Sequence, residues 1–163
     1  MIARYVKITM LFCLAACAFL IAFTNLSDYA GNAPFVQHVF SMDTTFRDPA
    51  VAYRAIKAPW VWTLGYALII AGEALTCLLF VAAGVKLFAA RNAPAAEFNR
   101  AKGLAHLAAL AGFLVWFLGF MAIGGEWFLM WQSASWNGQE AAFRFYVTIL
   151  LVLIYVNQPD DQP

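Results

Sequence analysis

Long apolar runs alternate with short polar segments along the chain, and each run is long enough to cross a membrane. The runs cover residues 5–25, 60–90, 103–131 and 141–157. About twenty predominantly apolar residues span the hydrocarbon core of a bilayer as an α-helix. The pattern therefore predicts an all-α fold, a bundle of four transmembrane helices.

The connections between these runs differ in length. Residues 91–102 and 132–140 form short polar loops, whereas residues 26–59 form a longer one. The connection 26–59 is too long for a turn and too apolar for a disordered segment. We therefore expect it to be helical in part and to form a structured loop between the first two spans.

Capping residues predict two short helices in this loop. Asn32 is suited to cap a helix over residues 33–40. Asp48 is suited to cap a second helix, which would end at Pro59 and lie on the membrane surface. After the last span, residues 157–163 are polar, and we expect this tail to be frayed.

Composition supports a single integral membrane domain over residues 1–163. The chain is 64% hydrophobic and 12% charged, whereas soluble domains carry about 25% charged residues. The net charge is +1 and the basic residues form no patch, so we expect the lipid bilayer and no nucleic acid as a partner. We expect the first span to be retained as a helix because its apolar run is longer than that of a signal peptide.

The distribution of basic residues predicts the orientation. Four spans place both termini on one side of the membrane, and that side carries six bases: Arg4, Lys7, Lys86, Arg91, Arg100 and Lys102. The other side carries four bases: Arg47, Arg54, Lys57 and Arg144. The positive-inside rule then places both termini and the loop 91–102 in the cytoplasm, and the loops 26–59 and 132–140 outside.

Cysteine and histidine give no cofactor or metal site in the sequence. Cys13, Cys17 and Cys77 lie within predicted spans, and we expect them to be small apolar packing residues. His38 and His106 are predicted on opposite sides of the membrane, so they are not expected to bind one haem. We expect no cofactor.

Glu73 is the single charged residue between Trp60 and Lys86. A carboxyl at this depth must face the protein interior, find a partner or stay protonated. It fits either a proton or cation site or a structural tie between two helices. Gly65 and Gly72 lie beside it, and small residues allow close approach of a neighbouring helix. We expect Glu73 to point into the bundle and favour the structural tie, because the sequence offers no second ionisable residue at that depth.

A second set of charged residues lies near the predicted outer boundary. Arg144 and Glu126 are at the ends of spans joined by a short loop, so we expect them to pair. Asp43 is a competing partner for Arg144, and His38 lies in the same outer loop. These groups fit a structural clasp or, alternatively, a site for a substrate or partner.

Four segments of the outer loops and their flanks carry a resemblance to a known family. They read FVQHVFSMDTTF (35–46), GEWFLMWQS (125–133), WNGQ (136–139) and FRF (143–145). They resemble a bacterial family described as predicted small integral membrane proteins, domain of unknown function 2165. The resemblance implies a bacterial four-span protein with no assigned activity and supplies no catalytic residues. We expect the membrane to be the bacterial inner membrane.

Three functional hypotheses follow. The first is a non-enzymatic accessory or assembly subunit that presents the outer loops to a membrane-protein partner or to a second copy of itself. The second is a small transporter or channel component that uses Glu73 for a proton or cation. The third, an enzyme with a site formed by Asp43, His38, Glu126 and Arg144, has little support because no catalytic motif is found.

Overall fold

The computed structural model describes residues 1–46 and 48–160, and every regular element within them is a helix. The long helical segments are α1 (Ile2–Ser27), α3 (Pro59–Ala89), the run of α4 (Ala95–Ala101), α5 (Gly103–Phe113) and η2 (Leu114–Trp127), and α6 (Gln139–Asn157). The short elements are α2 (Tyr29–Ser41), η1 (Ala52–Arg54) and η3 (Met130–Gln132).

Within these described residues, four helices are long and apolar enough to cross a membrane, as the hydrophobic pattern predicts. They are Ile2–Ser27, Pro59–Ala89, Ala95–Trp127 and Gln139–Asn157. Leu68, Leu78 and Leu151 on their surfaces are more than 60% exposed. Large exposed apolar surfaces are rare in soluble proteins and suit contact with lipid.

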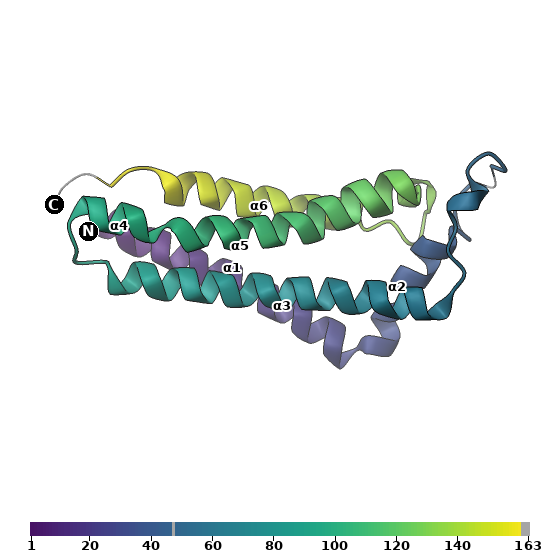
Figure 1. Cartoon of the computed structure of the whole chain (residues 1–163), viewed down its shortest axis with the longest axis horizontal. Coiled ribbons are helices and arrows are strands. Elements are labelled where there is room, and N and C mark those ends of the chain that lie inside the picture. Colours follow the sequence, from purple (N-terminus) through teal and green to yellow (C-terminus); the bar gives the residue numbers. More distant parts are fainter. Residues whose placement is uncertain (47, 161–163) are drawn as a thin grey trace.

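The long helices pack side by side, and both termini lie at the same end of the molecule (Figure 1). We call this end the terminal end. The opposite end is formed by α2, η1, η3 and the segments around them, that is, by the described residues of 28–58 and 128–138; we call it the cap. The positions of the termini match the even number of spans that the sequence predicts.

Glycine allows close approach of α3 to its neighbours, as expected. A Cβ atom added to Gly72 would lie 2.5 Å from Cγ2 of Val115, and one added to Gly65 would lie 2.8 Å from the Phe40 ring. Gly112 packs against Ile149 of α6 in the same way. Gly119 makes no such contact with another helix, and the expected close approach is confirmed for Gly65 and Gly72.

The third span differs from its prediction at both ends and in its winding. It begins at Ala95, within the predicted loop 91–102, because α4 continues into α5 with a break near Lys102. Its second half, η2, is a π-helix, in which each amide bonds the carbonyl five residues back; Phe128 N still reaches Ile123 O at 3.0 Å. Such winding is uncommon and often occurs near functional sites.

The cap contains one of the two predicted loop helices. Helix α2 begins four residues before Ala33, and its N-cap is Asp28, whose carboxylate accepts from Gly31 N, rather than Asn32. The second predicted helix is wrong. Asp48 accepts from Ala50 N in a local turn, a short 3₁₀ turn follows, and Pro59 opens α3 instead of ending a helix.

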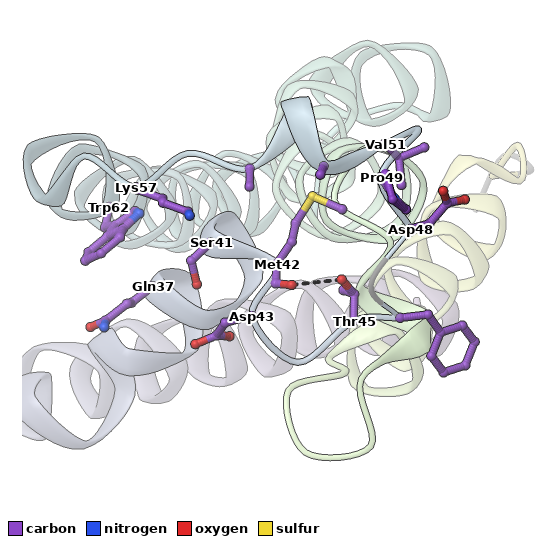
Figure 2. A pocket seen from close by; sticks show the side chains of 13 residues that line it. Gln37, Ser41, Met42, Asp43, Thr45, Asp48, Pro49, Val51, Lys57 and Trp62 are labelled. Carbon is purple, nitrogen blue, oxygen red and sulfur yellow. Dashed lines mark hydrogen bonds between the residues drawn. The ribbon is translucent and has the colours of Figure 1, made fainter.

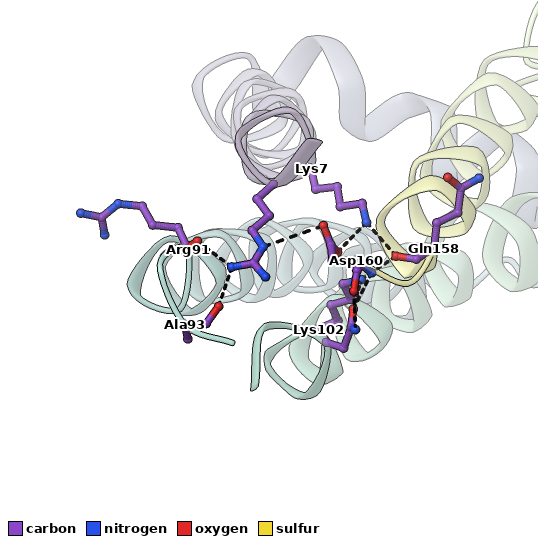
Figure 3. A network of polar contacts seen from close by, with 8 residues as sticks. Lys7, Arg91, Ala93, Lys102, Gln158 and Asp160 are labelled. Atoms are coloured by element: carbon purple, nitrogen blue, oxygen red, sulfur yellow. Dashed lines mark hydrogen bonds and ion pairs between the residues drawn. The ribbon is translucent and has the colours of Figure 1, made fainter. Parts of the chain in front are cut away.

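A network of ion pairs closes the terminal end (Figure 3). Oδ2 of Asp160 lies 2.7 Å from Lys7 Nζ and 2.9 Å from Lys102 Nζ, and both lysines donate to Gln158 O as well. Arg4 donates to the carbonyls of Arg91 and Ala93. The expected frayed tail is therefore wrong for residues 158–160, and residues 161–163 lie outside the described part.

The surroundings of Asp160 change the pKa of its carboxyl. Burial raises the pKa of Asp160, but hydrogen bonds and charge from Lys7 and Lys102 outweigh it and hold the pKa below its ordinary value. The Asp160 side chain is 6% exposed and the Lys7 side chain 3%. Removing one partner of such a buried group leaves an uncompensated charge.

The expectation that the cysteines are packing residues is confirmed for Cys77, which packs against the buried apolar core, and is wrong for the other two. Cys13 and Cys17 are exposed on α1 and Cys77 is half-buried on α3; all three are free. Ala18 and Ala22, on another side of α1, are buried instead and belong to the face that packs against its neighbours.

Candidate functional site

Glu73 points into the protein, as predicted, and its partner comes from the first span. The side chain is fully enclosed, and Nδ2 of Asn25 on α1 donates to Oε2 of Glu73 at 2.8 Å. The Tyr66 hydroxyl, two helical turns before Glu73 on α3, donates to the backbone carbonyl of Asn25 at 2.9 Å. Three polar side chains therefore join α1 to α3 in an apolar surrounding.

Sequence reasoning missed Asn25 and Tyr66. Tyr66 lies seven residues before Glu73, so a shared helix face was readable from the spacing. Asn25 lies at the predicted end of the first span, and a polar residue at that position is typical of the boundary between a span and a loop. Its carbonyl is among the last four of α1, which lack intrahelical donors, and the Tyr66 hydroxyl supplies one.

A cavity of about 420 Å³ extends from Glu73 to the cap; we call it the Glu73 cavity. It lies among α1, α2, α3, η2, α6 and the segment 135–138. Aromatic side chains form much of its wall: Phe35, Tyr66, Trp116, Phe120, Trp136 and Phe145. Asn32, Ser135 and Asn137 add polar groups near the cap. Pockets of this size with a few polar groups in an apolar wall suit small molecules.

A second, smaller cavity adjoins the Glu73 cavity. Trp116 and Phe145 lie with ring centroids 5.2 Å apart and border both this cavity and a smaller one of about 180 Å³. Thr76, one turn along α3 from Glu73, lines the smaller cavity. Beyond it, buried apolar side chains such as Phe80 and Leu87 fill the space toward the terminal end.

The charge of Glu73 is not matched by a cation. Within residues 1–46 and 48–160, no lysine, arginine or histidine forms an ion pair with it, and Oε1 makes no hydrogen bond. Burying an unpaired carboxylate is costly, so such a group holds a proton or attracts a cation. A proton on Glu73 or a cation bound beside it would each neutralise this charge.

The cap residues that carry the resemblance contact one another. His38 Nδ1 lies 2.8 Å from Asp43 Oδ2, and the His38 ring stacks on Trp136 with centroids 4.5 Å apart. Thr44 Oγ1 donates to Ser133 Oγ at 2.8 Å. These contacts fasten the segment 132–138 to the end of α2.

The predicted pair of Arg144 and Glu126 is wrong. Among the described residues, the carboxylate partner of Arg144 is Glu140, one turn earlier on α6, and both side chains are more than 70% exposed. Glu126 is exposed, and its carbonyl accepts from Arg54 at 3.5 Å. The helical spacing of Arg144 and Glu140 makes the local pair easy to form, so no contact across the loop is required.

Of the four residues considered for an enzyme site, the structure pairs only His38 and Asp43, within the part of the chain that it describes. A cavity of about 680 Å³ in the cap, which we call the cap cavity, is lined by Asp43 together with Asp48 and Lys57 (Figure 2). Thr45 Oγ1 donates to Met42 O across its floor. Glu126 and Arg144 do not line this cavity.

The histidines lie far apart. His38 belongs to α2 in the cap, whereas His106 belongs to α5, which begins at the terminal end (Figure 1). Nδ1 of His106 lies 3.3 Å from Lys102 O. One chain cannot use both to ligate a single haem. Over residues 1–46 and 48–160, no group of three or more His, Cys, Asp or Glu side chains is arranged to hold a metal ion.

Comparison with known proteins gives one match. Residues 3–159 match the family described as predicted small integral membrane protein (DUF2165). No curated protein and no solved structure matches the chain. Because the match covers nearly the whole chain, the protein belongs to this family, as its resemblance indicates.

Proposed function

We propose that this predicted small integral membrane protein binds a proton or small cation at Glu73 as a component of a transporter or channel. The observation that carries the proposal is the position of Glu73, a buried carboxyl without a cationic partner among the described residues, on the wall of the Glu73 cavity. From the sequence alone, a structural tie is favoured over an ion site. The Glu73 cavity changes this balance, because it places the carboxyl, together with Asn25 and Tyr66, on the wall of a space that a ligand can occupy.

The asymmetry of the molecule supports the same proposal. The Glu73 cavity reaches the cap, whereas packed apolar side chains and the Asp160 network close the terminal end. A carrier that exposes its site to one side at a time requires one open and one closed end. The two residues between the larger and smaller cavities, Trp116 and Phe145, are where a path toward the terminal end would have to open.

The test is proton or cation flux in vesicles reconstituted with the full chain. The Glu73→Gln variant removes the charge and keeps the shape, so flux is expected to fall at least about tenfold. Glu126→Gln is the matched control, because Glu126 is exposed and outside the cavity. Unchanged flux in a folded Glu73→Gln protein would contradict the proposal and leave the carboxyl as a structural tie.

A second candidate function is the accessory or assembly subunit that the outer loops suggest. The cap cavity favours it, since Asp43, Asp48 and Lys57 offer charged groups in a concave surface large enough for a partner's side chains. Phe46 and Trp131 beside it are at least half exposed. Pull-down in mild detergent tests this candidate. A strictly monomeric protein without a co-purifying partner would contradict it.

We further propose that the chain lies in a bacterial inner membrane with the terminal end in the cytoplasm. Six of the ten basic residues belong to that end, and five of the six tryptophans belong to the other end, where they suit the membrane interface. Labelling of single engineered cysteines in intact cells tests the orientation. Reagent access to Lys57→Cys but not to Arg100→Cys is expected; the reverse pattern would contradict it.

A further inference from the structure

We infer that the Glu73 cavity takes an organic cation, a positively charged nitrogen or phosphorus centre that carries apolar substituents. This inference rests on the proposed binding function of Glu73 and names the class of ligand. It follows from the size of the cavity, the chemistry of its wall and the single unmatched carboxyl at its base.

Two groups of packed aromatic rings contribute to the wall of the cavity. Phe35 lies 5.8 Å from Phe120 and 6.4 Å from Trp136, measured between ring centroids. Trp116 and Phe145 form the adjoining pair near Glu73. Cations bind the faces of such rings, and cages of aromatic side chains recognise alkylated ammonium groups.

The carboxyl supplies the charge that the ligand must match. Glu73 belongs to the cavity wall, and Asn25 occupies Oε2, so Oε1 is available to a ligand. An anion would place like charges together in an apolar surrounding, and a neutral ligand would leave the charge of the ionised Glu73 unmatched. A monovalent cation satisfies the charge.

A bare metal ion fits the cavity poorly. Hard cations require six or more oxygen ligands, and softer metals require several histidine or cysteine ligands. The cavity wall offers one carboxyl, and the described residues hold no metal-binding group of three. The volume of about 420 Å³ is instead within the range that small organic ligands occupy.

The experiment measures binding of tetraphenylphosphonium to the purified full chain in detergent by equilibrium dialysis. Tetraphenylborate has the same shape and the opposite charge, and it serves as the control for partition into the micelle. Saturable binding of the cation and not of the anion is expected. Glu73→Gln is expected to weaken the binding of the cation at least tenfold.

A second pair of variants tests the aromatic wall without touching the carboxyl. Phe145 lines the cavity, whereas Phe143 on the same helix is 51% exposed and does not line it. Phe145→Leu is expected to weaken binding about threefold to thirtyfold, in keeping with loss of a cation–aromatic contact. Phe143→Leu is expected to leave binding unchanged.

Equal binding of tetraphenylphosphonium and tetraphenylborate, or equal effects of Phe145→Leu and Phe143→Leu, would overturn the inference. The proposed function of Glu73 and the proposed class of ligand can be contradicted independently of each other. Proton flux that depends on Glu73 without binding of the organic cation would overturn the ligand class and leave the proposed function intact. Flux and binding that are both insensitive to Glu73→Gln would overturn both.

Discussion

Asn25 on α1 donates its side-chain amide to the carboxyl of Glu73 on α3, across 2.8 Å, although 48 positions separate them in the chain. The same Asn25 accepts from Tyr66 through its backbone carbonyl at 2.9 Å. The amide therefore orients the carboxyl on the wall of the Glu73 cavity and ties the end of α1 to α3. This contact and three others, those of Asp160, Gly72 and Trp136, lead to five predictions.

Asn25→Ala is expected to lower the free energy of unfolding by about 1–3 kcal/mol, because it leaves the buried Glu73 carboxyl without its hydrogen-bond donor, whereas the backbone carbonyl that Tyr66 bonds is kept. The measurement is reversible unfolding in detergent. In a Glu73→Ala background the loss should be smaller by about 1 kcal/mol, since the carboxyl that Asn25→Ala leaves without a donor is already absent. Thr24→Ala, at an exposed neighbouring position, is the control. Additive effects of Asn25→Ala and Glu73→Ala would disprove the coupling.

Asp160→Asn is expected to destabilise the protein by about 3 kcal/mol near neutral pH, because Lys7 and Lys102 lose a shared buried counter-charge. Thermal unfolding in detergent measures this loss. Glu97→Gln removes an exposed carboxylate from the same end and should have little effect. Equal melting temperatures for the Asp160→Asn variant and the unmodified protein would show that the network does not stabilise the fold.

The Asp160 network also predicts a pH dependence. The pKa of Asp160 is lower in the folded protein than its ordinary value of 3.8, so folding favours the ionised form. The stabilisation is fully present above pH 3.8 and is lost as pH falls through the lower, folded pKa. Unfolding measured between pH 5 and pH 2, in steps of about half a unit, should show an acid-dependent loss that Asp160→Asn reduces. An identical acid profile in the variant would exclude Asp160 as its source.

Gly72→Ala is expected to destabilise the packing of α3 against η2 by about 1–2 kcal/mol. The added Cβ would lie 2.5 Å from Cγ2 of Val115, whose branched side chain has little freedom to turn away. Gly103→Ala is the matched control, because a Cβ there meets nothing within 4 Å. Unfolding in detergent compares the two. Val115→Ala should relieve the clash in the double variant; a Gly72→Ala protein as stable as Gly103→Ala would contradict the packing.

Trp136→Ala is expected to loosen the segment 132–138 from α2, because it removes the stack on His38. Hydrogen exchange read by mass spectrometry should show amides of this segment exchanging about tenfold faster. Trp60→Ala removes a tryptophan that is 70% exposed at the start of α3 and is the control. Unchanged exchange in Trp136→Ala would show that Thr44 and Ser133 hold the segment without the stack.

Much of the fold could be predicted because span length and polarity are local properties. The run 60–90 is predominantly apolar, and the observed helix Pro59–Ala89 differs from it by one residue at each end. The second loop helix failed because Asp48 and Pro49 suit an isolated turn as well as a helix start. The predicted pair of Arg144 and Glu126 was wrong because their proximity was inferred from the short loop between their spans. Glu140 lies one turn from Arg144 on the same helix and pairs with it instead.

The sequence by itself determined that four helices cross the membrane, that both termini share one end and that Glu73 is buried. These follow from the lengths of the apolar runs and from the cost of exposing a carboxyl to lipid. The tertiary structure decided what Glu73 meets: Asn25, Tyr66 and a cavity with aromatic walls. The tertiary structure also places the Lys7 ammonium in contact with the Asp160 carboxylate, although these residues are 153 positions apart. Helix packing brings such residues together, and no local pattern in the chain records which faces of distant helices will meet.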